Sequence, residues 1–125
     1  LVLMPQNGGI EAALNTGLTY IGEQLPAVAY VARLDCGDEN KPNRIQAQRA
    51  VLEDHPEIGI VGSLVDFVDM EGVKLFTYQA PAASRSIKKW MYIKNCFIHP
   101  AVCFRLSLAK QVGFYPTNYK SAEDY

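Results

Sequence analysis

Apolar positions recur along this chain with two spacings, one typical of helices and one typical of strands. Residues 9–22 carry apolar side chains three and four positions apart, which predicts an amphipathic helix. A second helix is predicted over residues 42–54, because its proline suits a first helical turn and the His-Pro pair that follows stops it. Two shorter helices are predicted over residues 87–93 and 107–112.

Continuous apolar runs between these helices predict strands. Residues 1–4 are expected to form a short buried strand, and residues 27–34 a strand inside a sheet. Residues 58–68 are nearly all apolar and predict one long central strand, which an Asp-Met-Glu-Gly turn connects to a returning strand over 73–78. Residues 101–104 predict the last strand. Because strands alternate with helices, the predicted fold class is α/β, with a mostly parallel sheet flanked by helices.

Length and composition narrow the class of protein. A chain of 125 residues, 49% hydrophobic and 20% charged, is at most one globular domain. Its net charge of −1 gives no support for nucleic-acid binding, and no apolar run approaches the length of a membrane span. Three cysteines without metal-ligand spacing fit a reducing compartment better than a disulfide framework. Because the chain opens as the inside of a strand and stops directly after an acid pair, we expect a domain truncated at both ends.

Two pairs of acidic residues are the main candidates for chemistry. The strand over 27–34 ends in Asp35 and Asp38, and ligands of open α/β sheets bind where strands end. Carboxylates there suit Mg²⁺ or Mn²⁺, and such an ion can hold a diphosphate. The alternative is a solvated loop in which Asp38 helps to cap the next helix. The second pair, Glu123 and Asp124, is equally consistent with an ordinary loop charge pair.

Other polar and aromatic residues leave alternatives open. Arg33 precedes Asp35 by two positions and suits a contact with a nucleotide or a carboxylate, although an edge charge at the end of a strand fits as well. Gln48 is polar on an otherwise apolar helix face and is expected to brace the Asp35 loop. Three aromatic residues are interpreted as packing beneath a loop rather than stacking on a sugar: Trp90, Tyr92 and Phe97.

Eight short motifs, taken in order, resemble the middle of a glycosyltransferase family 2 catalytic domain. Together they cover essentially the whole chain, and none is specific alone. They are Asn7-x-Gly9, Ala13-Leu14-Asn15-x-Gly17-Leu18, Ala32-Arg33-x-Asp35-x-x-Asp38, Pro42-x-Arg44-Ile45-x-x-Gln48, Val61-Gly62-Ser63, His99-Pro100-x-Val102-x-Phe104-Arg105, Gly113-x-Tyr115 and Glu123-Asp124-Tyr125.

The resemblance implies a Rossmann-like GT-A nucleotide-diphospho-sugar transferase domain, with residues 1–125 as part of the catalytic domain. The full-length parent would be a metal-dependent, inverting glycosyltransferase of the hexosyltransferase type, and this fragment alone would be inactive. Implied partners are a nucleotide-diphospho-sugar donor and a saccharide or lipid-linked acceptor, as in bacterial polysaccharide biosynthesis. The implied location is the cytoplasm, at the inner face of the cell membrane. An exposed strand edge left by truncation would also favour a homo-oligomer.

The resemblance also implies roles for particular residues. Asp35 would lie near the ribose and the metal ion, Asp38 would be the more direct metal ligand, and Mn²⁺ or Mg²⁺ would be the cofactor. Asp124 would be the catalytic base, with Glu123 orienting it or the acceptor. The family's strand-end motif usually reads Asp-x-Asp-Asp, whereas Gly37 stands at the middle position here. The remaining residues implied to bind the nucleotide sugar are Asn7, Gly9, Asn15, Arg33 and His99.

Two other functions remain open. One is a non-catalytic nucleotide-sugar binding or interaction module, which Gly37 favours slightly. The other is a nucleotidyltransferase, which would place acids at the same sheet edge but usually brings a Gly- and Arg-rich phosphate loop near its first strand. No such loop is visible in these 125 residues.

Overall fold

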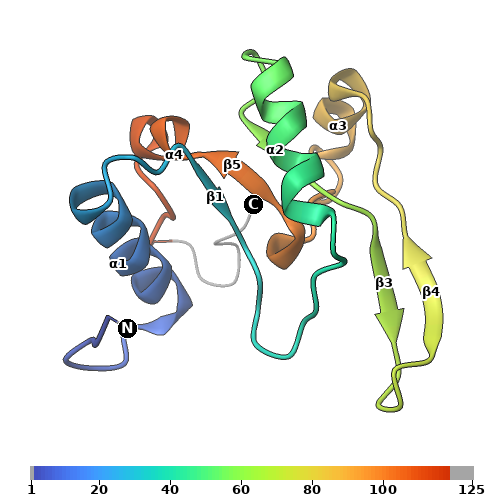
Figure 1. Ribbon diagram of the computed structural model, residues 1–125, viewed down its shortest axis with the longest axis horizontal. Coiled ribbons are helices and arrows are strands. Elements are labelled where there is room, and N and C mark those ends of the chain that lie inside the picture. Colours follow the sequence, from blue (N-terminus) through green and yellow to red (C-terminus); the bar gives the residue numbers. More distant parts are fainter. Residues whose placement is uncertain (1, 119–125) are drawn as a thin grey trace. The chain divides into compact units, whose positions relative to one another are not determined.

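The computed structural model describes residues 2–118 (Figure 1). The chain forms two compact units, one comprising the residues up to Val31 and those from Phe104 on, the other Ala32–Cys103. The division falls within two strands, β1 (Tyr30–Ala32) and β5 (Cys103–Arg105). No helix within residues 2–118 is long and apolar enough to cross a membrane.

The first unit contains helices α1 (Gly9–Gln24) and α4 (Leu106–Val112), both close to their predicted positions. Helix α1 continues past Gly22, where it was predicted to end, because a single glycine costs a helix only about 1 kcal/mol. Helix α4 ends at Gly113, whose φ of +91° is the left-handed conformation that glycine adopts readily after a helix. The strand predicted at the start of the chain is absent from residues 2–4, and Leu3 is 82% exposed.

The second unit is built around helix α2 (Arg44–Asp54), which ends at His55 as predicted. Its buried side chains are Gln48 and Leu52, which lie four residues apart and therefore on one face of the helix. Leu52 is completely buried, and Cys96, Ala101, Val102 and Cys103 complete the core of this unit. All three cysteines are free thiols, of which Cys96 and Cys103 are buried and Cys36 is exposed.

A three-stranded sheet has the order β1-β5-β2, where β2 is Ile60–Val61. Its strands have two or three residues each and are shorter than predicted. Two backbone hydrogen bonds flank the β1–β5 pair, from Arg33 N to Val102 O and from Leu106 N to Ala29 O. Residue numbers rise along one strand as they fall along the other, which is the pattern of antiparallel neighbours. The α/β class is therefore confirmed, but a mostly parallel sheet is not.

The long central strand predicted over 58–68 is wrong, because β2 and β3 (Val65–Val68) belong to different sheets. The chain leaves the first sheet at Gly62 and Ser63. A Cβ atom on Gly62 would lie 3.2 Å from the ring of Phe97, so the backbone approaches that ring more closely than most residues permit. The Ser63 hydroxyl accepts a hydrogen bond from Gln48 of α2 instead of pointing along a strand.

Strands β3 and β4 (Lys74–Tyr78) form an antiparallel hairpin, as predicted (Figure 1). Phe67 and Phe76 are paired across it, and their stacked rings lie 4.7 Å apart between centroids. In the turn, the Asp69 carboxylate accepts hydrogen bonds from the backbone N–H groups of Glu71 and Val73. Gly72 has a φ of +81°, so the turn uses the left-handed conformation that glycine permits.

The hairpin is expected to lose stability in acid, because Asp66 of β3 accepts hydrogen bonds from Lys41, Thr77 and Lys74. The bond from Lys41, then those from Thr77 and Lys74, lower the pKa of Asp66 well below its ordinary value. The folded state therefore favours the ionised carboxylate of Asp66. The stability that this carboxylate contributes to the protein is complete above about pH 4 and is lost as the pH falls further.

This expectation is checked by urea unfolding of the protein and of Asp66→Asn, which cannot titrate, at several pH values. The variant should be the less stable of the two at pH 6, and the difference should shrink as the pH falls from 6 toward 2. A difference that does not change with pH would contradict the assignment.

Helix α3 (Ser84–Trp90) begins three residues before the predicted helix over 87–93, and hydrogen-bonded turns continue it to Lys94. A short 3-10 helix, His99–Ala101, then precedes β5. Residues of α2, β2, α3 and the segment 96–98 surround a largely apolar cavity of about 340 Å³. None of the residues predicted to bind metal or nucleotide lines this cavity.

Candidate functional site

The acidic residues after β1 lie in a tight turn. The backbone N–H of Asp38 donates to the carbonyl of Asp35 at 3.2 Å, and Gly37 has a φ of +94°. Positive φ at the third residue of a turn is the hallmark of type II turns, which favour glycine there. Gly37 therefore stands where the family usually has its middle acid, and glycine is the residue that this backbone conformation favours.

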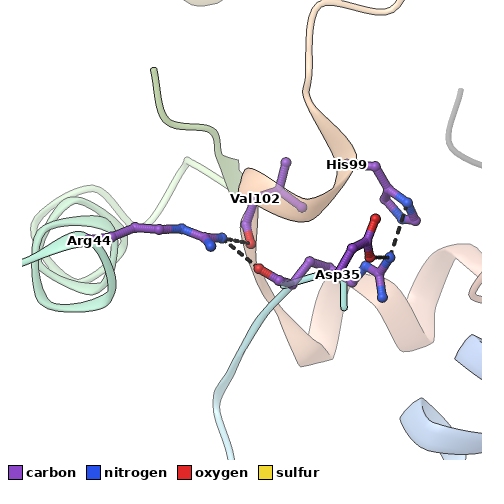
Figure 2. A network of polar contacts seen from close by, with 5 residues as sticks. Asp35, Arg44, His99 and Val102 are labelled. Carbon is purple, nitrogen blue, oxygen red and sulfur yellow. Dashed lines mark hydrogen bonds and ion pairs between the residues drawn. The ribbon is translucent and has the colours of Figure 1, made fainter. Parts of the chain in front are cut away.

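Arg33 connects Asp35 with His99 in the second unit (Figure 2). Its Nη2 atom lies 2.6 Å from Asp35 Oδ1 and 3.3 Å from His99 Nδ1. A guanidinium can only donate, so Nδ1 of His99 accepts and carries no proton in this arrangement. The ion pair is partly shielded, since the Arg33 side chain is 14% exposed and that of Asp35 44%. The buried Nε of Arg33 has no hydrogen-bond partner within the described residues.

Asp38 is exposed, and no hydrogen bond or ion pair engages its carboxylate within residues 2–118. Its charge nevertheless reaches Arg44. Burial lowers the pKa of Arg44, and the negative charge of Asp38 acts in the opposite direction by favouring the charged guanidinium. Asp38 therefore presents a carboxylate to solvent beside a fixed positive charge.

Arg44, in the first turn of α2, anchors the backbone beneath the acidic turn. Its Nη2 donates to the carbonyl of Arg33 at 2.8 Å and to that of Val102 at 3.2 Å, so it joins the segment after β1 to the segment before β5 (Figure 2). Its Nη1 donates to Asn40 Oδ1. Arg44 belongs to one of the motifs that resemble the family, but no role was predicted for it.

Gln48 lies one helical turn after Arg44 and is 3% exposed. Its amide N–H₂ group faces three acceptors, Ala101 O at 2.8 Å, Ser63 Oγ at 2.9 Å and Val61 O at 3.2 Å. Its amide oxygen accepts from Arg44 Nε at 3.2 Å. Gln48 was expected to brace the Asp35 loop. It directly braces β2 and the 3-10 helix instead, and it reaches the acidic turn only through Arg44.

Replacing Gln48 with methionine should destabilise the protein by about 1–3 kcal/mol, because buried carbonyl groups would lose their donor. Methionine nearly preserves the volume of the side chain, so lost hydrogen bonds rather than a cavity should dominate. Urea unfolding measures the change, and Gln46→Met, at an exposed position of the same helix, is the matched control. Equal stability of the two variants would contradict the bracing role.

The other residues predicted to bind the nucleotide sugar lie in the first unit, where they make local contacts. The Asn7 side chain accepts from the N–H of Gly9 at 3.0 Å, at the start of α1. Asn15 pairs with the backbone of Tyr115: its Nδ2 donates to Tyr115 O and its Oδ1 accepts from Tyr115 N, both at 2.9 Å. Asn15 thereby fixes the segment after α4. The predicted catalytic residues are outside the described residues: Glu123 and Asp124.

The donor chemistry of the acidic turn suits a hard divalent cation, although no three His, Cys, Asp or Glu side chains gather as a metal cluster within residues 2–118. Mg²⁺ sites that include a substrate phosphate commonly use only one or two protein carboxylates. Asp38 has a free carboxylate, and Asp35 has one oxygen that the Arg33 ion pair does not engage. The residues present therefore fit such an ion when a diphosphate supplies the remaining ligands.

These features define an α/β protein with an acidic turn after a strand. Arg44 of helix α2 holds the backbone next to this turn by hydrogen bonds, and Gln48 of the same helix holds Arg44. The chain belongs to glycosyl transferase family 2, whose model matches residues 1–113.

Similar curated proteins are also glycosyltransferases by name. The chain is 32% identical to the amylovoran biosynthesis glycosyltransferase AmsE of Erwinia amylovora, over 100% of the chain and 45% of that protein. It is 31% identical to the UDP-Gal:alpha-D-GlcNAc-diphosphoundecaprenol beta-1,3-galactosyltransferase of Escherichia coli, over 98% of the chain and 42% of that protein. The chain thus spans less than half the length of these relatives. No solved structure matches it.

Proposed function

We propose that the full-length protein is a glycosyltransferase with a GT-A fold, which moves a hexose from a nucleotide-diphosphate donor to an acceptor hydroxyl. Membership of glycosyl transferase family 2 supports this class of reaction. The observation that carries it in the structure is the acidic turn at Asp35 and Asp38, which Arg33 and Arg44 hold at the end of β1.

The cofactor of this proposal is Mn²⁺ or Mg²⁺. Asp38 would hold it directly, and the unpaired oxygen of Asp35 would assist. When bound, the ion would offset the negative charge that develops on the departing nucleoside diphosphate. Arg33 fixes the orientation of Asp35, and Arg44 fixes the backbone from which both acids project.

The proposed reaction is a single displacement that inverts the anomeric carbon. Asp124 takes the proton of the acceptor hydroxyl as general base, with Glu123 orienting it or the acceptor. The transition state has oxocarbenium character, as in other glycosyl chemistry. This assignment of the base rests on the resemblance of the Glu123-Asp124 motif to that of the family.

The names of the relatives support the proposed partners. One relative is named for UDP-Gal and a diphosphoundecaprenol-linked sugar, and the other for amylovoran biosynthesis. By extension from these names, we propose that this protein uses a nucleotide-diphospho-sugar donor and a saccharide or lipid-linked acceptor. We also propose that it acts in bacterial polysaccharide biosynthesis. A lipid-linked acceptor favours a cytoplasmic location at the inner face of the cell membrane.

The test is sugar transfer by the full-length protein, with UDP-sugars offered in the presence and absence of Mn²⁺. Metal-stimulated transfer, or slow metal-stimulated hydrolysis of the donor, is the expected result. Tight donor binding without either reaction would instead identify a nucleotide-sugar binding module, the function that Gly37 slightly favours. Release of pyrophosphate from UTP and a sugar 1-phosphate would identify a nucleotidyltransferase.

A further inference from the structure

Charge is distributed unevenly along the chain, although its net charge is only −1. Residues 1–71 contain eleven acidic and four basic residues. Between Glu71 and Glu123 the sequence has no Asp or Glu but eight Lys and Arg residues. The second half of the chain is therefore strongly basic, and nothing in the proposed transfer reaction uses most of these charges.

Four of these basic residues occur within helix α3 and the turn that follows it: Arg85, Lys88, Lys89 and Lys94. All four are exposed. The same eleven residues, 84–94, carry exposed aromatic and aliphatic side chains. Trp90 is 42% exposed, Ile93 is 80% exposed and Tyr92 is 92% exposed. We call residues 84–94 the basic-aromatic segment.

Packing beneath a loop is therefore wrong for Tyr92, which is 92% exposed, whereas Trp90 is only 42% exposed. The reason lies in the local helical geometry. Ile87 lines the cavity of the second unit, so it marks the inner face of α3. Residues 85, 88, 89 and 92 fall on the opposite side at helical spacing, which is the side that faces solvent.

One basic and one aromatic side chain of the segment are in contact with each other. The ammonium of Lys94 lies 5.0 Å from the ring centroid of Trp90 and 5.6 Å from that of Tyr78. Such cation–π contacts hold a positive charge beside an aromatic ring without neutralising it. Charge and apolar surface thus share one exposed segment, and no acidic residue within it reduces the charge.

We propose that the basic-aromatic segment docks the protein onto a membrane surface rich in anionic phospholipids. Lysine and arginine side chains are attracted to anionic headgroups, while tryptophan and tyrosine favour the boundary between headgroups and acyl chains. The exposed side chain of Ile93 adds apolar surface, and removing that surface from water is favourable in free energy. A soluble polyanion would satisfy the four charges but would leave the exposed Trp, Tyr and Ile side chains in water. The lipid surface accounts for both properties.

This inference deepens the proposed location of the protein, but it does not require the proposed reaction. Vesicle binding needs neither a sugar donor nor an acceptor. Failure to dock would therefore leave the transferase proposal intact, and failure to transfer sugar would leave docking intact.

The experiment is co-sedimentation of the full-length protein with vesicles. One set contains equal parts of phosphatidylglycerol and phosphatidylcholine, and the other contains phosphatidylcholine alone. We expect binding to the anionic vesicles only, weakened by added salt because headgroup attraction is screened. Trp90 is the single tryptophan of the 125 residues, so its emission should shift to the blue on binding. Trp90→Phe identifies the part of the signal that belongs to it.

Two sets of variants locate the surface. Lys88→Gln with Lys89→Gln should weaken binding to anionic vesicles about 30-fold, since each basic residue near such a surface contributes about fivefold. Tyr92→Ser with Ile93→Ser should weaken binding and reduce the shift in emission. The matched controls are Arg49→Gln, an exposed basic residue paired with Glu53, and Met70→Ser, an apolar residue that is 99% exposed between two acids. Neither control should change binding.

Several outcomes would overturn the proposal. They are equal binding to neutral vesicles, no binding to either set, and double variants that bind as the unaltered protein does. Equally tight, salt-sensitive binding of soluble polyglutamate without a shift in Trp90 emission would also overturn it, by identifying a general polyanion site. The altered residues are exposed, so each variant should fold, and circular dichroism of each variant is the check.

Discussion

Replacing Asp38 with alanine is expected to abolish metal-stimulated sugar transfer by the full-length protein while the fold survives. Gly37 stands where the family usually has an acid, so Asp38 and one oxygen of Asp35 are the carboxylate donors that we propose for the metal ion. Removing even a group that only supports a metal ligand typically costs 10–100-fold in metal affinity, and losing a ligand itself should cost at least about 100-fold. Because the side chain is exposed, its removal should leave the free energy of unfolding nearly unchanged.

The measurement is the transfer rate as a function of Mn²⁺ concentration, accompanied by urea unfolding. Glu39→Ala is the matched control, because Glu39 is the adjacent acid and is also exposed. It should leave the response to Mn²⁺ unchanged. An Asp38→Ala protein that still responds to Mn²⁺ as the unaltered protein does would refute the metal assignment.

Replacing Asp124 with asparagine should reduce transfer by about 10²–10⁴-fold, the usual loss when a general base is removed. Asparagine keeps the size of the side chain and most of its hydrogen bonding, but it cannot accept a proton. Donor binding should therefore persist while the rate of transfer falls. Calorimetry with the nucleotide sugar measures binding, and the rate at saturating donor measures the chemical step.

Glu123→Gln provides the comparison for the neighbouring acid. If Glu123 only orients the acceptor, this change should raise the acceptor KM more than it lowers the rate at saturation. Should Asp124→Asn turn over at the rate of the unaltered protein, Asp124 is not the base, and a large loss in Glu123→Gln would transfer that role to Glu123.

Helix positions were predicted to within three residues, because apolar spacing marked α1 and the His-Pro pair marked the end of α2. The strands were harder. Apolar content alone joined β2 and β3 into one strand, since neither the contact between Gly62 and Phe97 nor the bond from Gln48 to Ser63 leaves a periodic signal. The direction of β5 against β1 is also a property of long-range pairing, which a local pattern does not encode.

Sequence reasoning identified the acidic turn because an apolar run ended there. It missed Arg44, whose bonds reach the backbone of Arg33 and Val102. Carbonyl acceptors are present at every residue, so no residue type marks them in a sequence. The placement of Arg44 and Gln48 four residues apart on one helix was the available signal, because it puts both on the same face.

The backbone at Gly37 bears on how acids could be gained or moved in this turn. A Cβ atom there would meet no neighbour within 4 Å, so an aspartate would find room. It would, however, have to adopt a φ of +94°, and the left-handed region costs a residue with a side chain about 1–2 kcal/mol. That cost is small beside the stability of a typical domain, so a Gly37→Asp protein is expected to fold. The positions of the carboxylates in this turn can therefore be changed by directed evolution. The main obstacle to a new side chain at residue 37 is the backbone conformation, not a clash with neighbouring atoms.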